Sequence, residues 1–463
     1  MASIDAELET LRNLVQNKKL ENQGASSSRN PRIGKVPLML QGHKDYERYF
    51  NPRGVAIGPI LHGRNNKYAP AEKLKQRLAA EFIRDSGKKM DDLYEKIKVN
   101  VESLKNCYDK EIIKEYNNDD DDKKIAWILF VDGCAVLQFI NSLVEGNLKK
   151  LRIKNDLAAF ATQDLLLLEN QIPFDVLELL MSETKNGNKF WLSILRFIHK
   201  NMGLVSSNTD SVSDETLARE AKEIPKPIHL LDLLRTRLLC LHRTNDRRID
   251  MPNSTKNISC PGRFFGLTGT GNVKKDQDKE WNTFRNISEL KSAGIRVKRS
   301  TISCFRTGID FTSGFLRGTL RLPPIRVDDS TGPILMNLVA YEMCPDYANE
   351  FEITSYVCLL DSLIDHPEDV KELRKANILH NMLGSDEQVA KLFNEISIDL
   401  VPNDEAYFRV KNDMQFHYDK KWKTWIAEGL HDHFGSPWTF LAFGGALLGL
   451  VFSAIQAWYS PKK

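Results

Sequence analysis

The sequence contains little cysteine, with seven residues among 463. No two of them form a C-x-x-C pair, and an odd total cannot be paired off completely. A disulfide framework is therefore not predicted. Cys134, in the segment FVDGCAVL, has apolar neighbours. That context is typical of a cysteine that packs as a small buried hydrophobic side chain.

An excess of charge of either sign is also absent. The chain has 65 Lys and Arg against 62 Asp and Glu, which gives a formal net charge of +3. Such a small net charge creates no overall field that would attract nucleic acid or an acidic partner. We therefore predict no nucleic-acid partner.

Motifs for nucleotides, metals and catalytic nucleophiles are missing. Gly266, Gly269 and Gly271 resemble a phosphate-binding loop, but no G-K-[ST] follows them. Residues 117–122 (NNDDDD) are acidic, but they lack the alternating ligand spacing of a calcium loop. We predict no cofactor, no metal site and no catalytic residue, and we interpret both segments as solvated connections.

A cleaved secretory signal is not predicted, because Asp5, Glu7 and Glu9 leave no continuous apolar stretch in the first twenty residues. The apolar residues there recur at helical spacing, at Ile4, Leu8, Leu11 and Val15. This spacing predicts an amphipathic helix over residues 1–21.

One long apolar run is present, near the C-terminus. Residues 438–458 read WTFLAFGGALLGLVFSAIQAW and contain no charged side chain. At ~1.5 Å per residue this helix would span about 31 Å, which matches a hydrocarbon core of ~30 Å. We predict one transmembrane helix over residues 437–459, the alternative being a buried core helix. The predicted anchor residues are Trp438, Phe440, Leu441, Phe443, Leu447, Leu448, Leu450, Val451, Phe452, Ile455 and Trp458.

The predicted membrane helix contains a G-x-x-x-G pair, Gly445 and Gly449, through which two copies could form a homodimer. Upstream, residues 405–432 read as an amphipathic helix leading to the membrane. Its lysines could bind anionic lipid headgroups, or they could form the solvated face of a packed helix. With the span at the end of the chain, we expect the N-terminal body to face the cytosol, at the plasma membrane or an endomembrane. The lysines on the two sides of the span are nearly balanced, so they do not decide the orientation.

The rest of the chain has the composition of a globular protein, with 41% hydrophobic and 27% charged residues. We predict a mainly helical body with a small antiparallel β-sheet. The predicted divisions are a linker over 22–35, a helical lobe over 36–202, a partly mobile connection with a short helix over 203–280, and a second lobe with the sheet over 281–434.

The sheet is predicted from alternating apolar residues between glycine-marked turns in residues 294–327. The same stretch is rich in bases, namely Arg296, Lys298, Arg299, Arg306, Arg317, Arg321 and Arg326. These bases could bind a phosphate or an acidic surface, or they could occupy the solvated face of the strands. No aromatic platform of the kind used by single-strand binders lies among them, so the second interpretation is favoured.

Six strings of residues occur together in a fixed order. They are VAIGPILHG (55–63), VDGC (131–134), DLLLLENQIPF (164–174), HLLDLLR (229–235), NLVAYE (337–342) and LGSDEQVAKLFN (383–394). With the terminal apolar run, they resemble the plant family called domain of unknown function 247. The resemblance implies a membrane-associated plant protein without an established biochemical activity. Some relatives are associated with self-incompatibility, which suggests recognition.

The blocks also contain acid, base and ligand types that a hydrolase would need, in His62, Asp132, Asp164 and Glu169. The alternative is structural, because Glu169, Asn170 and Gln171 could all satisfy backbone groups at the turn into a helix near Phe174. Where relatives often have two histidines in the first block, Leu61 precedes His62 here, which weakens a metal site. His431 and His433, next to the predicted membrane helix, are also weak candidates for metal ligands.

We therefore predict a membrane-tethered protein that acts in recognition or signalling through contacts with a partner protein. An enzyme of unrecognised type and a passive membrane scaffold are the alternatives.

Overall fold

The computed structural model describes the larger part of the chain. The described residues are 32–63, 68–114, 116, 119–203, 213–240, 286–314, 317–347, 350–418, 441–442, 444–446 and 448–453. Several predictions fall outside these residues. They are the helix over 1–21, nearly all of the linker over 22–35, the glycines of 266–271, the helix beyond Tyr418, the histidines at 431 and 433, and the anchor residues Trp438, Phe440, Phe443, Leu447, Ile455 and Trp458.

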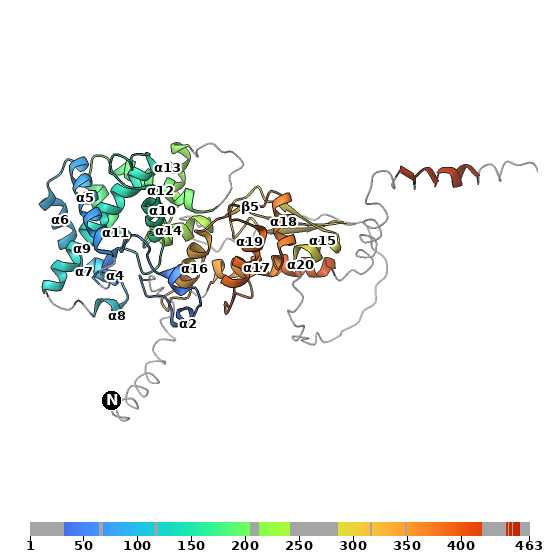
Figure 1. The fold of residues 1–463 in the computed structure, drawn as a ribbon, viewed down its shortest axis with the longest axis horizontal. Helices are drawn as coiled ribbons and strands as arrows, with labels where there is room; N and C mark the ends of the chain where they lie inside the picture. The colour runs from blue at the N-terminus through green and yellow to red at the C-terminus, as the bar shows by residue number, and fades with distance from the viewer. Residues whose placement is uncertain are drawn as a thin grey trace, which may run out of the picture.

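The first part of the chain is helical, as its apolar spacing predicts. The helices are α2 (Leu38–Gln41), α3 (Tyr46–Phe50), α4 (Gly58–Leu61), α5 (Ala69–Ser86), α6 (Met90–Val99), α7 (Val101–Lys105), α8 (Lys110–Ile113), α9 (Asp119–Val144), α10 (Asn155–Asp164), α11 (Phe174–Ser182), α12 (Gly187–Asn201), α13 (Asp214–Glu223) and α14 (Leu230–Leu238). In Figure 1 most of them gather at one end of the molecule around α9.

Helix α9 is the central element of this group. Its segment Asp120–Val144 is the one helix in the described part of the chain that is long and apolar enough to cross a membrane, but 78% of its most apolar window is buried inside the body. Helices α5, α6, α11 and α12 pack around it. Gly133 allows the close approach of α11, because a Cβ there would lie 2.7 Å from a Val176 methyl group. The glycine of VDGC therefore lies at a close contact between α9 and α11.

The aspartates of the acidic run form the first turn of α9, so the interpretation of the run as a connection is wrong for residues 119–122. Asp120 pairs with Lys123 at 3.1 Å and Asp122 with Lys105 at 2.6 Å. Carboxylates in the first turn of a helix also interact favourably with its positive end. Among the residues that the structure describes, no group of His, Cys, Asp and Glu could hold a metal ion.

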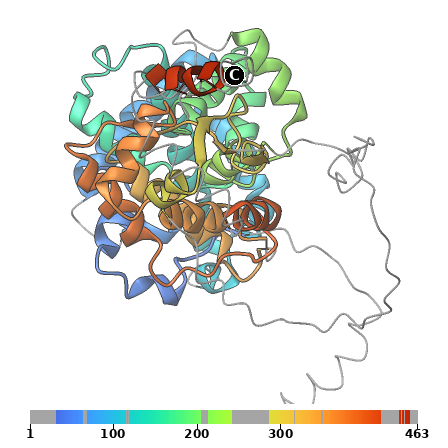
Figure 2. The ribbon, with the colours of Figure 1, turned by 90° about the vertical axis from the view of Figure 1, so that its right-hand side faces the viewer.

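The second part of the chain combines helices with two small sheets. Its elements are α15 (Ile287–Ser292), β1 (Ile295–Arg299), β2 (Asp310–Ser313), β3 (Gly318–Leu322), β4 (Ile325–Val327), α16 (Thr331–Glu342), α17 (Glu352–Leu363), α18 (Pro367–Lys375), β5 (Leu379–Asn381), α19 (Asp386–Ile396) and α20 (Phe408–Tyr418). Viewed along the long axis in Figure 2, the yellow strands lie among the orange helices that follow them.

The prediction of a wholly antiparallel sheet is wrong. The strand order is β1-β3-β2, with β2 antiparallel to β3 but β1 parallel to it, so the sheet is mixed. The strands themselves lie at the predicted positions. Two further strands, β4 and β5, pair in parallel as a separate ladder.

The bases in this stretch mostly lie on the solvated side of the strands or form ion pairs. Arg296 and Lys298 are exposed on β1. Arg321 pairs with Asp310 at 2.9 Å, and Arg306 with Glu352 at 3.2 Å. This arrangement agrees with the solvated-face interpretation of the basic stretch.

One hydrophobic core runs through both parts of the chain. Helix α16, which carries NLVAYE, is buried along its whole length between them. Asn337 on α16 donates to the Tyr49 carbonyl at 2.7 Å and accepts from the Leu168 amide at 2.7 Å. The division into lobes at the predicted boundaries stays a prediction.

Candidate functional site: buried polar networks and an ionic pocket

The polar residues of DLLLLENQIPF and VDGC converge on one irregular segment, residues 53–58, which leads into α4. Asp164, at the end of α10, accepts hydrogen bonds from the backbone amides of Arg53, Gly54 and Val55 at 2.7–2.9 Å. Burial raises the pKa of the Asp164 carboxyl, and the three amides oppose that rise. A carboxylate with three amide donors holds backbone in place and has little capacity left for a substrate.

Asn170 completes this clamp from the turn between α10 and α11. Its Oδ1 accepts from the Ile57 amide at 2.6 Å, and its Nδ2 donates to the carbonyls of Val55 and Asp164 at 3.0 and 2.8 Å. All three hydrogen-bonding directions point to backbone. The Asn170 side chain therefore satisfies backbone groups of this segment, as a neighbouring strand would do in a sheet.

Gln171 performs the same role for its own turn. Its Nε2 donates to the carbonyls of Leu165 and Leu167, each at 2.8 Å, and its Oε1 accepts from the Leu231 amide at 3.2 Å. The last bond joins DLLLLENQIPF to HLLDLLR. The prediction that Asn170 and Gln171 satisfy backbone groups before a helix at Phe174 is confirmed.

Asp132 and Lys75 form a buried ion pair at the end of the clamped segment. Their carboxylate and ammonium lie 2.7 Å apart, with side chains 2% and 4% exposed. Asp132 also accepts from the Gly58 amide at 2.8 Å, and Lys75 donates to the Ala56 carbonyl at 2.9 Å. The cavity beside the pair has a volume of about 30 Å³, which is too small for a substrate.

The remaining candidates lie apart from this pair. Glu169 accepts from the Val36 amide at 2.9 Å, and His62 follows α4 at the half-exposed end of the first block. The four residues that we considered as a catalytic group therefore do not share a pocket. Their carboxylates are occupied by backbone amides or by Lys75.

A second buried network joins HLLDLLR to NLVAYE, and no local sequence pattern indicates it. Arg235 lies between Glu342 at 2.9 Å and Glu352 at 3.5 Å, with 2% of its side chain exposed. Glu342 also accepts from the amides of Ile353 and Thr354 at the start of α17. Every acceptor site of this buried carboxylate thus faces a donor, as a stable buried charge requires.

Next to this network, His229 begins α14. Its Nδ1 accepts from the Asp232 amide at 3.1 Å, and its ring meets Tyr341 edge-on with the centroids 4.8 Å apart. Complete burial lowers the pKa of His229 to about 3. The imidazole is therefore neutral near pH 7 and serves as a helix cap.

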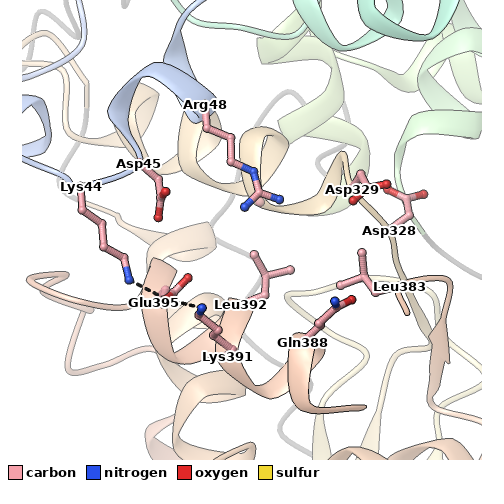
Figure 3. Close-up of a pocket in the computed structure, with 11 residues that line it drawn as sticks. Lys44, Asp45, Arg48, Asp328, Asp329, Leu383, Gln388, Lys391, Leu392 and Glu395 are labelled. Atoms are coloured by element: carbon pink, nitrogen blue, oxygen red, sulfur yellow. Dashed lines mark hydrogen bonds and ion pairs between the residues drawn. The ribbon is translucent and has the colours of Figure 1, made fainter. Parts of the chain in front are cut away.

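One of several solvent-accessible pockets lined by charged residues of both signs is formed by segments far apart in the sequence. Its volume is about 410 Å³, and it lies between α3, the loop before α16, and α19. The lining residues are Lys44, Asp45, Arg48, Asp328, Asp329, Gly332, Leu383, Gln388, Lys391, Leu392 and Glu395. Figure 3 shows Arg48 reaching from α3 into the space between Asp45 and Asp329, above Leu392.

The charges in this ionic pocket differ in how far they are neutralised. Lys44 pairs with Glu395, and Asp328 pairs with Arg326 at 3.3 Å. Within the part of the chain that the structure describes, Asp45, Arg48 and Asp329 make no ion pair. The pocket therefore presents one cation and two anions that a ligand could neutralise.

Most of the chain matches one known protein family. The model of the DUF247 family, described as plant protein of unknown function, matches residues 33–452. The chain belongs to the DUF247 family. The resemblance drawn from the six blocks is thus confirmed.

Two curated relatives from Arabidopsis thaliana share most of the DUF247 chain. UPF0481 protein At3g47200 is 28% identical over 427 residues, which cover 88% of this chain and 82% of the relative. Putative UPF0481 protein At3g02645 is 24% identical over 492 residues, with 92% and 89% covered. No solved structure matches this chain significantly.

The DUF247 blocks differ in where the fold places them. The first five lie largely in the interior, where they make the clamp and the Arg235 network, although the first block ends half-exposed at His62. LGSDEQVAKLFN instead supplies Leu383, Gln388, Lys391 and Leu392 to the ionic pocket. Its helix is capped by Ser385, which accepts from the Gln388 amide at 3.4 Å, while the Gln388 side chain accepts from the Gly384 amide at 3.0 Å.

The predicted anchor is described only in part. A short apolar helix runs from Gly444 to Ser453, drawn in red in Figure 1. A Cβ added at Gly445 or Gly449 would meet nothing within 4 Å. The transmembrane span and the Gly445–Gly449 dimer contact stay predictions.

Proposed function

We propose that this DUF247 protein is a membrane-tethered recognition protein, held at the bilayer by its C-terminal helix and binding a partner protein through the ionic pocket. The observation that carries the proposal is the exposure of the apolar residues in that helix. Leu441, Leu448, Leu450, Val451 and Phe452 are 48–72% exposed. Exposed apolar surface of this kind marks a contact with lipid or with another protein.

Lipid is the contact that we favour, because the run has no charged side chain from 438 to 458 and carries tryptophan at both ends. A protein-binding helix would be expected to keep a polar face along its length. The absence of charge on every face of the predicted helix fits a bilayer better than a groove.

We favour recognition as the role of the body because its buried polar groups are internally bonded, whereas the charges of the ionic pocket are accessible. The buried carboxylates are occupied by internal donors, while the ionic pocket keeps Asp45, Arg48 and Asp329 available to a ligand. Arg48 suits a carboxylate of the partner, and the two aspartates suit a nearby lysine or arginine. We therefore propose a partner surface or peptide with charges of both signs.

The tether is tested by charging the C-terminal helix of the full-length protein expressed in plant cells. Leu448→Arg combined with Leu450→Arg is expected to move the protein from the carbonate-resistant membrane pellet to the supernatant, because each buried arginine costs about 2.5–3.5 kcal/mol at the centre of a membrane helix. Leu38→Arg with Met39→Arg is the matched control, since both residues are 82% exposed on the folded body. Retention of the charged anchor variant in the pellet would show that the helix is not the tether.

The pocket is tested separately by reversing its free cation. Arg48→Glu is expected to leave the protein in the membrane pellet but to abolish proximity labelling of the partners that the wild type labels in the same cells. The matched control is Arg84→Glu, since Arg84 pairs with Glu81 on an exposed face and is 70% exposed. If Arg48→Glu labels the same proteins to the same extent, the pocket is not the recognition site.

A further inference from the structure

Strand β5 is an edge of its sheet. It pairs with β4 on one side, and no strand in the described part of the chain lies on its other side. The far edge of β4 is covered, because the Arg326 amide donates to the Gly203 carbonyl at 2.6 Å. The ladder of β4 and β5 therefore has one open edge, and that edge belongs to β5.

The pairing of β5 shows which of its backbone groups face outward. The Ile378 carbonyl accepts from β4 at 2.8 Å, and the Met382 amide donates to β4 at 2.8 Å. Because the backbone groups of successive residues in a strand point to opposite sides, His380 also faces β4, whereas Leu379 and Asn381 face away from it. Among the described residues, the backbone amides and carbonyls of Leu379 and Asn381 have no hydrogen-bond partner.

The open edge lies in a polar groove with a volume of about 740 Å³, the β5 groove, which is lined by residues of α18, β5 and the start of α19. Arg374 on α18 donates to both carboxylate oxygens of Asp386 on α19, at 3.0 and 2.8 Å. The Asn381 side chain donates to the same carboxylate at 2.9 Å. These bonds hold the groove in shape without a ligand, which lowers the cost of binding one.

The β5 groove presents charges of both signs beside the open edge. Lys371 and Glu368 on α18 are exposed, as is Glu387 on α19, and none of them makes an ion pair with a residue that the structure describes. Met382, which follows β5, is 67% exposed. Lys371 therefore suits an acidic residue of a ligand, and the two glutamates suit a basic residue. Met382 suits an apolar residue of variable shape.

We propose that an extended segment of a partner protein binds in the β5 groove as a third strand beside β5, with an acidic residue against Lys371. Leu379 and Asn381 would each contribute one amide and one carbonyl to the new ladder. An extended backbone is the ligand that fits such an edge, because it presents acceptors and donors at the same spacing. The inference rests on the proposed function in one respect, namely that the ligand of the body is a protein.

The block LGSDEQVAKLFN connects the β5 groove to the ionic pocket. Asp386 and Glu387 line the groove, whereas Leu383 and Gln388 line the ionic pocket. Figure 3 shows Leu383 and Gln388 close together at the start of α19. A segment that leaves the groove across the start of α19 reaches the ionic pocket, so one ligand can contact both sites.

The probe is a phage-displayed library of random linear peptides, selected on the full-length protein in detergent. The enriched peptide of highest affinity is expected to slow hydrogen exchange of the Leu379 and Asn381 amides at least about tenfold, because these amides gain acceptors. The His380 amide, which already faces β4, should keep its exchange rate. This alternation identifies an added strand, because a ligand that merely covers the groove does not select every second amide.

The charge contact is tested by Lys371→Glu. This variant is expected to bind the enriched peptide about tenfold more weakly, because it replaces an attraction with a repulsion. Lys73→Glu, at an exposed lysine on α5, is the matched control and should bind as the wild type does. Arg48→Glu separates the inference from the proposed function. A peptide that is lost in Arg48→Glu but never protects the Leu379 and Asn381 amides would overturn the added strand and leave recognition by the ionic pocket standing.

Three further results would overturn the proposal. One is a selection that enriches no peptide, and another is equal protection of the Leu379, His380 and Asn381 amides by the bound peptide. The third is slow exchange of the Leu379 and Asn381 amides in the protein alone. That result would show that another segment of this chain or, where the protection depends on protein concentration, a second copy already covers the edge.

Discussion

Replacing Arg235 by methionine is expected to lower the free energy of unfolding by about 3–5 kcal/mol. The guanidinium is the internal partner of Glu342, whose side chain is fully buried. Methionine fills a similar volume but carries no charge, so the variant leaves a buried carboxylate without its cation. It also removes the stacking of the guanidinium over Tyr347, which lies 4.8 Å from the ring centre. Both interactions exist only in the folded protein, so their loss destabilises the folded state and leaves the unfolded state unchanged.

Arg306→Met is the matched control for this substitution. Arg306 pairs with the same Glu352 that Arg235 contacts, but 56% of its side chain is exposed. A solvent-exposed pair of this kind contributes at most about 1 kcal/mol. Urea unfolding followed by circular dichroism should separate the two variants by several-fold in destabilisation. Equal losses would mean that burial does not set the strength of the Arg235 network.

Local sequence patterns predicted most elements but not how they pair. The alternation of apolar residues located β1, β2 and β3, since side chains on a strand point alternately to its two faces. The same alternation serves parallel and antiparallel neighbours, so it could not reveal that β1 runs parallel to β3. Strand β5 has only three residues, Leu379–Asn381, which is too short for a period to appear.

Helix α13 was missed for a different reason. Its stretch is poor in large apolar residues, and we predicted a mobile connection there, yet Asp214–Glu223 is helical. Ser213 caps it by accepting from the Thr216 amide, and Asp214 pairs with Arg196 on α12. Among the α13 side chains that the structure describes, Leu217 is the buried one. One buried residue gives no periodicity, so the capping serine was the only usable signal.

The candidate site shows the same limit. The turn at Asn170 and Gln171 could be interpreted from the proline that follows it, because that signal is local. Its partners at 53–58 lie more than a hundred residues earlier, and no spacing rule connects them. The ionic pocket likewise combines three distant segments. Sequence indicated which residues were unusual but not which of them face solvent.

The clamp on residues 53–58 leads to a second large effect. Gly58 ends the clamped segment with a positive φ of 73°, and a Cβ there would lie 2.6 Å from the Gln171 carbonyl oxygen. Gly58→Ala must therefore bear the cost of a left-handed backbone and also push against backbone that Gln171 itself holds in place. Together these costs are expected to lower the free energy of unfolding by about 2–5 kcal/mol.

Gly63→Ala separates the two contributions. Gly63 has nearly the same φ, 69°, but an added Cβ would meet nothing within 4 Å. It should lose only the backbone contribution, about 1–2 kcal/mol.

The two variants should be compared in urea unfolding, with hydrogen exchange of the Ile57 and Gly58 amides as a local readout. Faster exchange of these amides in Gly58→Ala alone is expected, because displacement of the segment weakens the bonds to Asn170 and Asp132. If both variants lose the same stability and keep the same protection, the fit of Gly58 against Gln171 does not hold the segment, and Asp164, Asn170 and Asp132 suffice to clamp it.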